Sequence, residues 1–270
     1  MLQKAVLGLA LACLLPAAHA DKVTAGMSNI SITFTDLDPN DAYVPDAVDR
    51  GGYADFETSV QPHSVYSPDY SADGGPGTFR YDDGRFGIQT VASVDFSTET
   101  IQSSLDVAAT GRHYGAEGRR VWSNDVWPTE GMRIAPNSRV TFSADAFYDV
   151  EFTTSCGEGA CPSFDFSPWL ALKVWTTPNY YTRDQLWGRA GTAGGEFSWA
   201  DGVKHNGSQL ISLSYTNTTN DWLYVTFESS YELRGQVGAV PEPETWALMV
   251  GGLGLLVAAR RRSKAGAGSH

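Results

Sequence analysis

Between Arg139 and Phe152, apolar and polar residues alternate almost without exception. Hydroxyl and carboxylate side chains fill most of the intervening positions, and Phe147 is the one bulky apolar residue among them. The alternating apolar residues are Val140, Phe142, Ala144, Ala146, Tyr148, Val150 and Phe152. A period of two is typical of a β-strand with one buried face. The run therefore predicts a long strand that covers a core.

Similar β-rich runs, bounded by Gly, Pro, Asn and Asp, recur along the chain. They span residues 28–35, 88–96, 104–109, 169–176, 209–215 and 222–233. The last two runs flank residues 216–221 and predict a hairpin with a longer loop. Its second strand is expected to point these side chains inward: Leu223, Val225, Phe227, Tyr231 and Leu233. Residues 39–87 and 111–136 are expected to form long loops, with a turn at Asp82, Asp83 and Gly84.

The part of the chain between residues 21 and 239 has no long segment of helical period and no repeat of fixed length. Many short strands separated by turn clusters predict an all-β body, an antiparallel β-sandwich of jelly-roll kind. The body, residues 21–239, is expected to be one domain between two targeting segments.

The N-terminus has the pattern of a secretory signal peptide, expected to form a short helix. Lys4 supplies a positive charge, residues 5–15 are apolar, and Pro16 ends that run. Ala18, His19 and Ala20 form a small-x-small cleavage site. The pattern predicts cleavage after Ala20 and export through the secretion machinery.

Residues 240–264 form a second targeting segment at the other end of the chain. A Pro-Glu-Pro element is followed by an uncharged apolar run at residues 246–259, and then by an arginine cluster. Fourteen residues make a helix about 21 Å long, against roughly 30 Å of hydrocarbon, so a short or transient membrane span is expected. The arginines are expected to stay cytoplasmic. Residues 265–270 are expected to be an unstructured tail.

This tail resembles the PEP-CTERM sorting signal of Gram-negative bacteria. The resemblance implies that an exosortase, a membrane cysteine transpeptidase, recognises Pro241, Glu242 and Pro243. It implies that Arg260, Arg261 and Arg262 form the stop. The precursor would then be anchored transiently in the inner membrane before it reaches the cell surface or a polysaccharide matrix. The same tail is also catalogued as an ice-binding protein C-terminal domain. An ordinary single-span anchor is the alternative.

The net charge of the chain excludes one class of partner. The formal net charge is −12, and the body is more acidic than the whole chain because the tail carries the arginine cluster. Nucleic acid is therefore excluded as an expected partner.

Cys156 and Cys161 have four residues between them, and this spacing predicts a local disulfide in an oxidising compartment. Their spacing does not suit a redox Cys-x-x-Cys motif or a zinc site.

Two weak ligand sites are suggested by residue type. Oxygen-bearing side chains at Asp36, Asp38, Asn40 and Asp41 could hold calcium, although an EF-hand is excluded because Gly and Glu are missing at its sixth and twelfth positions. An Asx-rich turn is the alternative. Trp122 and Trp127 are candidates for stacking on sugars from an exposed loop, whereas the tryptophans in strand patterns are expected in the core. Those core candidates are Trp169, Trp175 and Trp222.

No catalytic motif supports an enzyme. His63, His113 and His205 lack a nucleophile elbow, a zinc-binding helix or a phosphate loop around them. We therefore expect a noncatalytic surface or matrix protein, without a cofactor except for the calcium alternative, that associates with extracellular polysaccharide. A carbohydrate-binding module and a secreted hydrolase with paired carboxylates are the alternatives. Ice binding would need a flat Thr-rich face, and the sequence shows no such array.

Overall fold

A computed structural model of the chain describes most of the predicted body. The described residues are 21–43, 52–61, 63–68, 70–71, 75–84, 87–108, 113–122, 132–152, 161–175, 188–199 and 203–236. The described residues belong to one compact unit, Ala20–Gly238. The predicted signal peptide and the sorting tail, with its predicted helix at 246–259, lie outside the described residues. No helix long and apolar enough to cross a membrane occurs among the residues described.

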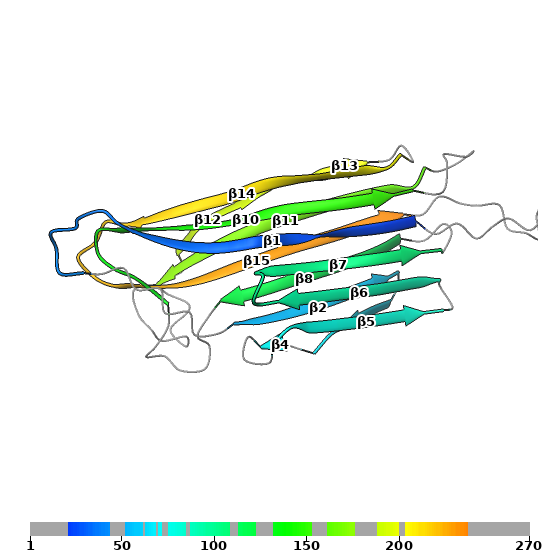
Figure 1. The fold of residues 1–270 in the computed structure, drawn as a ribbon, viewed down its shortest axis with the longest axis horizontal. Coiled ribbons are helices and arrows are strands. Elements are labelled where there is room, and N and C mark those ends of the chain that lie inside the picture. Colours follow the sequence, from blue (N-terminus) through cyan, green and yellow to red (C-terminus); the bar gives the residue numbers. More distant parts are fainter. Residues whose placement is uncertain are drawn as a thin grey trace, which may run out of the picture. The chain divides into compact units, whose positions relative to one another are not determined.

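Within the described residues, all regular structure is β-strand, arranged in two antiparallel sheets (Figure 1). Sheet A has the order β14-β10-β1-β7-β6-β5. Its strands are β1 (Asp21–Asp36), β5 (Gly77–Asp83), β6 (Ile88–Asp95), β7 (Thr100–Val107), β10 (Ser138–Glu151) and β14 (His205–Asn217). The prediction of an antiparallel all-β body is therefore confirmed, and its jelly-roll topology stays a prediction.

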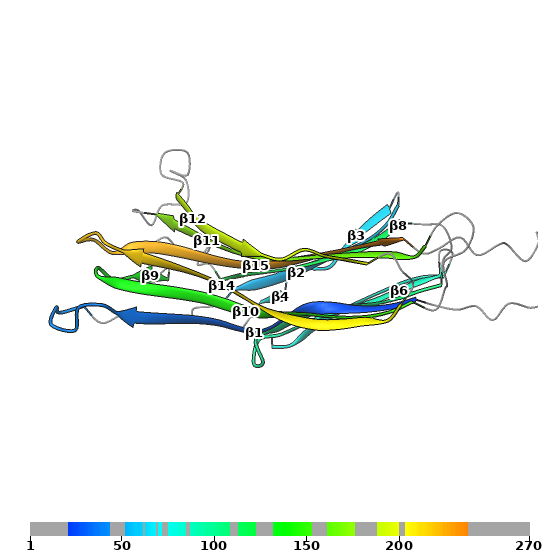
Figure 2. The ribbon, with the colours of Figure 1, turned by 90° about the horizontal axis from the view of Figure 1, so that it is seen from above.

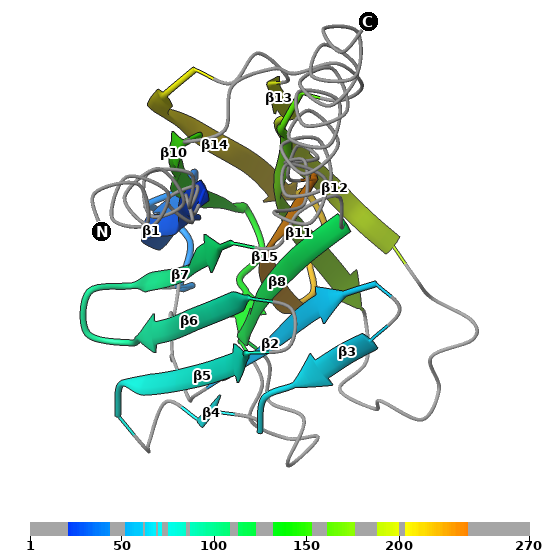
Figure 3. The same ribbon diagram turned by 90° about the vertical axis from the view of Figure 1, so that its right-hand side faces the viewer.

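Sheet B has the order β12-β11-β15-β8-β2-β3, and three short strands pair with its members: β13 with β11, β4 with β2, and β9 with β15. Its longer strands are β2 (Tyr53–Val60), β8 (His113–Trp122), β11 (Ser163–Trp175), β12 (Gly188–Gly194) and β15 (Leu223–Gln236). The others are β3 (His63–Tyr66), β4 (Tyr70–Ser71), β9 (Arg133–Ile134) and β13 (Phe197–Trp199). The two sheets lie one above the other (Figure 2), and the end view shows the strands of both layers (Figure 3).

The alternation in the sequence produces the buried face of each sheet. In β10, Val140, Phe142, Ala144 and Ala146 are fully buried, while Tyr148 is only partly so. In β15, the five predicted inward side chains are all buried. Burying each such aliphatic or aromatic side chain contributes roughly 1.5–3 kcal/mol. The inward predictions for these strands are confirmed.

Aromatic rings and one hydroxyl pair join the two sheets across the core. The rings of Phe142 in β10 and Phe227 in β15 lie 5.2 Å apart, centroid to centroid. The hydroxyl groups of Ser103 in β7 and Tyr231 in β15 are 2.7 Å apart. A Cβ atom at Gly118 would come within 2.5 Å of the Tyr231 ring, so only glycine leaves room for this ring.

A buried cation also links the sheets. Arg120, on the inner face of β8, is 2% exposed and forms an ion pair with Glu99, which lies in the turn between β6 and β7. The Arg120 guanidinium carbon lies 4.8 Å from the ring centroid of Phe96 and 4.2 Å from that of Trp122. A buried charge is tolerated where an ion pair and aromatic faces compensate for the lost hydration.

Two sequence predictions about the fold are wrong. β14 and β15 do not form a hairpin, because β14 pairs with β10 in sheet A while β15 lies between β11 and β8 in sheet B. Their connection crosses from one sheet to the other, and alternation alone does not tell which strand is the neighbour. The expected long loops contain β2 to β5 and β8 to β9. The turn predicted at residues 82–84 begins only at Gly84, because Asp82 and Asp83 still belong to β5 and pair with β6.

Candidate functional site

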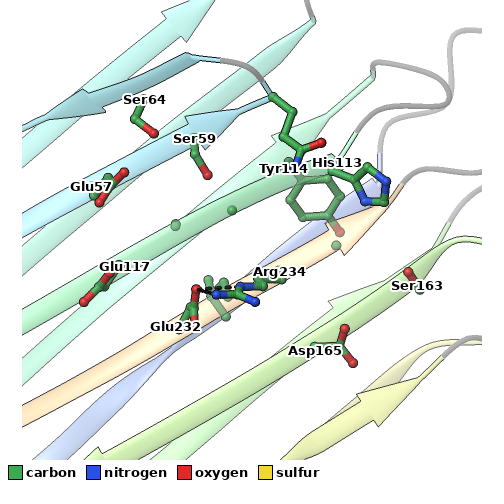
Figure 4. A pocket seen from close by; sticks show the side chains of 15 residues that line it. Glu57, Ser59, Ser64, His113, Tyr114, Glu117, Ser163, Asp165, Glu232 and Arg234 are labelled. Carbon is green, nitrogen blue, oxygen red and sulfur yellow. Dashed lines mark hydrogen bonds and ion pairs between the residues drawn. The ribbon is translucent and has the colours of Figure 1, made fainter.

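A depression of about 600 Å³ lies on the outer face of sheet B, at the end where β15 finishes (Figure 4). We call it the outer-face depression. Its lining comes from β2, β3, β8, β11 and β15 and from the residue that follows β2. The polar side chains in that lining are Glu57, Ser59, Gln61, Ser64, His113, Tyr114, Glu117, Ser163, Asp165, Glu232 and Arg234. This surface is therefore formed by regular strands and not by loops.

Three carboxylates form a row across the depression. Glu57 of β2 and Glu232 of β15 are both direct register partners of Glu117 of β8. Their side chains therefore share the outward face, as Figure 4 shows. Cβ atoms of directly opposed residues lie about 4.5–5.5 Å apart, and opposed like charges destabilise a sheet. Burial, followed by the charges of Glu232, Glu57 and Asp55, raises the pKa of Glu117 above the usual range of a glutamate.

Cations lie beside this row and neutralise part of it. Arg234 donates from Nε to Glu232 Oε1 at 2.5 Å. Four residues from Glu232 on β15, Glu228 accepts from Arg119 Nε and from Lys173 Nζ, each at 2.7 Å. Burial alone would raise the pKa of Glu228, but the hydrogen bonds and charges of Lys173 and Arg119 outweigh it and lower that pKa.

Hydroxyl groups and an imidazole complete the rim of the depression. Ser59 and Ser64 are register partners on β2 and β3, and His113 is exposed at the start of β8. Tyr66 of β3 is 70% exposed and opposes Glu57. The negative charge of Glu57 and a hydrogen bond to it raise the pKa of the Tyr66 phenol. The depression thus offers hydrogen-bond donors and acceptors, the groups that fix the orientation of a polar ligand, and the exposed Tyr66 ring lies beside Glu57, which lines it.

The predicted calcium residues lie at the opposite end of the sandwich, and their side chains close turns. Asp36 Oδ1 accepts from the backbone N of Asp38, and Asp38 Oδ1 accepts from that of Asn40. Asp41 accepts from the backbone N of Tyr43 and from Asn137 Nδ2. These bonds are those of an Asx-rich turn. In the part of the chain that the structure describes, no group of three or more His, Cys, Asp or Glu side chains is arranged to hold a metal ion. Calcium stays a prediction.

The prediction for Trp122 as a sugar-stacking residue is wrong, because this ring is 3% exposed and packs on Phe142 in the core at a centroid distance of 5.5 Å. Trp127 lies outside the described residues. Trp169 and Trp222, expected in the core, are only half-buried. Trp169 projects from the outer face of β11, where it is the register partner of Ser230. The side chain of Trp175 lies outside the described residues.

The three histidines considered for catalysis lie in separate places. His113 belongs to the depression, and His63 begins β3 in the same sheet. His205 begins β14 of sheet A and stacks on Trp199 of β13, in sheet B, at a centroid distance of 5.3 Å. Cys156 lies outside the described residues, so the disulfide between Cys156 and Cys161 stays a prediction. The recognition element at 241–243 and the arginines at 260–262 also lie outside them.

Sequence reasoning missed the carboxylate row. Glu57, Glu117 and Glu232 are far apart in the chain, and none lies in a motif. The one signal that could have found them is their position on outward-facing sites of β-strands, combined with the register of three strands. That register is a property of the fold and cannot be read from local pattern.

Comparison with known proteins identifies the tail. The family model of the PEP-CTERM protein-sorting motif matches residues 239–263. This motif indicates an exported, membrane-anchored precursor that an exosortase recognises. The match does not extend to the β-sandwich, and no curated protein matches the chain.

Proposed function

We propose that the chain is an exported, noncatalytic protein of the cell surface or extracellular matrix whose β-sandwich binds extracellular polysaccharide. In this proposal an exosortase sorts the precursor of a Gram-negative bacterium, after the secretion machinery has carried it across the inner membrane. The observation that carries the proposal is the outer-face depression, a polar surface built on five strands of sheet B.

The chemistry of the depression favours a particular class of sugar. Carboxylates accept hydrogen bonds from hydroxyl and amino groups, and charged acceptors give the stronger bonds. The row of Glu57, Glu117 and Glu232, in a protein of net charge −12, repels anionic sugars such as uronic acids. We therefore expect neutral or amino sugars as the ligand.

Cosedimentation with extracellular polysaccharide purified from the host tests the binding. The variant carries Glu57→Ala, Glu117→Ala and Glu232→Ala, and its apparent affinity should fall about tenfold or more, because hydrogen bonds to charged groups are lost. The matched control carries Ser31→Ala, Ser143→Ala and Ser212→Ala, which form a row of register partners on the outer face of sheet A. Equal affinity of both variants would contradict the proposal.

The sorting step has its own test. The intact mass of the protein from its host should show trimming near Pro241, and replacement of Pro241, Glu242 and Pro243 by alanine should abolish that trimming. A membrane-retained product of full length in both cases would mean that the tail is an ordinary anchor. This outcome would leave the binding proposal untouched.

One observation favours a second candidate, hydrolysis of a glycoside. The pKa of Glu117 is raised, and this carboxyl lies between Glu57 and Glu232 in the row. A protonated carboxyl beside an ionised one is the pair that glycosidases use. Release of reducing ends from host polysaccharide, abolished by Glu117→Gln, would replace the noncatalytic proposal with this one.

A further inference from the structure

A second cluster of side chains lies at the start of β15, whereas the outer-face depression lies where that strand finishes. It consists of Tyr43, Trp222 and Arg133, and we call it the aromatic cluster. Tyr43 follows β1, Trp222 directly precedes β15, and Arg133 belongs to β9. The loop after β1 and the connection from β14 to β15 lie at the same end of the sandwich, on the left of Figures 1 and 2.

The cluster holds an exposed ring in a fixed position. Tyr43 is 38% exposed, and its ring meets the half-buried Trp222 ring edge to face at a centroid distance of 6.0 Å. The Arg133 guanidinium carbon lies 5.0 Å from the centroid of Trp222. Edge-to-face and cation-π contacts of this kind are both attractive. Trp222 is thereby fixed from two sides, and it supports the Tyr43 ring.

Polar groups surround the exposed ring. Asp41 Oδ1 accepts from the backbone N of Tyr43 at 2.9 Å, and Asp41 Oδ2 accepts from Asn137 Nδ2 at 3.2 Å. Leu37, 44% exposed, lies at the same end, where its backbone N donates to the Asn137 carbonyl at 2.9 Å. An exposed ring with a carboxylate, an amide and a guanidinium nearby suits a ligand that has an apolar face and a polar rim, which is the chemistry of a sugar ring.

Two members of the cluster, Arg133 and Trp222, are on the outer side of sheet B, as the depression is. Arg133 is the register partner of Tyr224, and the neighbouring pair Ile134 and Leu223 is buried, so Arg133 and Tyr224 point outward. Because Arg133 lies over the Trp222 ring, that ring is also on the outward side. Between the two ends, Thr226, Glu228 and Ser230 of β15 lie on this side of the sheet, where Thr226 is half-buried and Glu228 and Ser230 are buried.

We propose that the aromatic cluster is a second sugar-binding subsite, and that one polysaccharide chain runs along the outer face of sheet B from this cluster to the depression. The inference rests on the proposed function. From Trp222 to Glu232, the strand advances roughly 33 Å at about 3.3 Å per residue, which exceeds the length of a single sugar ring. Occupation of both subsites by one chain therefore requires a polymer.

The test measures affinity against ligand length by isothermal titration calorimetry with the mature protein. The probes are size-fractionated fragments of the host's extracellular polysaccharide, one class shorter than roughly 15 Å and one longer than roughly 40 Å. The long fragments should bind roughly three- to tenfold more tightly than the short ones, a factor consistent with one stacked aromatic contact. Tyr43→Ala should remove this gain and leave the affinity for short fragments unchanged, whereas Tyr43→Phe should keep it.

Control experiments distinguish loss of the second subsite from misfolding and from failure of the proposed function. Leu210→Ala removes a large side chain that is 65% exposed on sheet A, and it should leave the length dependence unchanged. Thermal unfolding of each variant checks that the sandwich is intact. If the wild type binds short and long fragments equally, or if Tyr43→Ala keeps the gain, the second subsite is wrong and the depression stands alone. If neither class of fragment binds, the proposed function and this inference both fail.

Discussion

The two outer faces of the sandwich differ in how their polar groups are satisfied. On sheet A, hydroxyl side chains of neighbouring strands pair with each other. The pairs are Thr24 with Ser104 at 3.0 Å, Ser31 with Ser143 at 2.9 Å, and Thr141 with Ser214 at 2.9 Å. Such cross-strand pairs stabilise a sheet by a few tenths of a kcal/mol up to about 1 kcal/mol. This face is internally satisfied.

On the outer face of sheet B, carboxylates stand opposite one another on neighbouring strands, in place of hydroxyl groups. Glu117 opposes Glu57 on one side and Glu232 on the other. Like charges in direct opposition cost stability, so the fold gains nothing from this row. On the same strand as Glu232, Glu228 is instead paired with Arg119 and Lys173. The difference supports our proposal that the row binds a ligand, while the pairs on sheet A and at Glu228 support the fold.

The largest expected effect comes from breaking the ion pairs on sheet B. The Glu228 side chain is 7% exposed, so Glu228→Ala removes two buried, charged hydrogen bonds, from Arg119 and from Lys173, and should lower the free energy of unfolding by about 2 kcal/mol. Urea unfolding at neutral pH measures this loss. Ser143→Ala, the control on sheet A, should cost less than about 0.5 kcal/mol. Equal losses would break the comparison between the faces.

The same variant has a defined pH dependence. The pKa of Glu228 is lowered in the folded protein, so its contribution is present above the ordinary glutamate pKa, about 4.3, and is lost as the pH falls through the lowered folded value. The difference in stability between the wild type and Glu228→Ala should therefore shrink below about pH 4.

A smaller effect of opposite sign is expected within the carboxylate row. Glu117→Gln removes the like-charge repulsion from Glu57 and Glu232, and it should stabilise the protein at neutral pH by about 0.5 kcal/mol. Because the folded pKa of Glu117 is raised, the wild type loses stability as the pH rises from about 4.3 through that raised value. The gain should thus vanish at lower pH. Destabilisation at pH 7 would mean that the row supports the fold after all.

The sequence predicted strands well where one face is uniformly apolar. The alternation at residues 139–152 and the inward side chains of residues 223–233 are confirmed, because each reflects burial of a single strand face. Strand β8 was missed for the converse reason: its inner positions include Gly118, which makes room for Tyr231, and Arg120, which pairs with Glu99. Neither residue type signals a buried face when it is read locally.

The candidate site could not be predicted at all, since it depends on which strands are neighbours. The row joins residues from three strands, and the aromatic cluster joins the loop after β1 with β9 and the start of β15. The hydroxyl pairs of sheet A were equally invisible, because their partners are 73 or more residues apart in the chain. The sorting motif of the tail, by contrast, was predicted and is confirmed at residues 239–263, because a sorting signal is read as a contiguous segment.

The smallest expected effect comes from removing a hydroxyl pair on the outer face of sheet A. The double variant Thr141→Val with Ser214→Ala removes both partners of one hydroxyl pair and leaves no unsatisfied group behind. Valine also has a high β-propensity, so the free energy of unfolding should stay within about 0.5 kcal/mol of the wild type. Urea unfolding of the double variant beside each single variant measures this. A loss of about 2 kcal/mol, as expected for Glu228→Ala, would show that the hydroxyl pairs stabilise sheet A as strongly as the ion pairs stabilise sheet B. The two faces would then differ in chemistry but not in their contribution to stability.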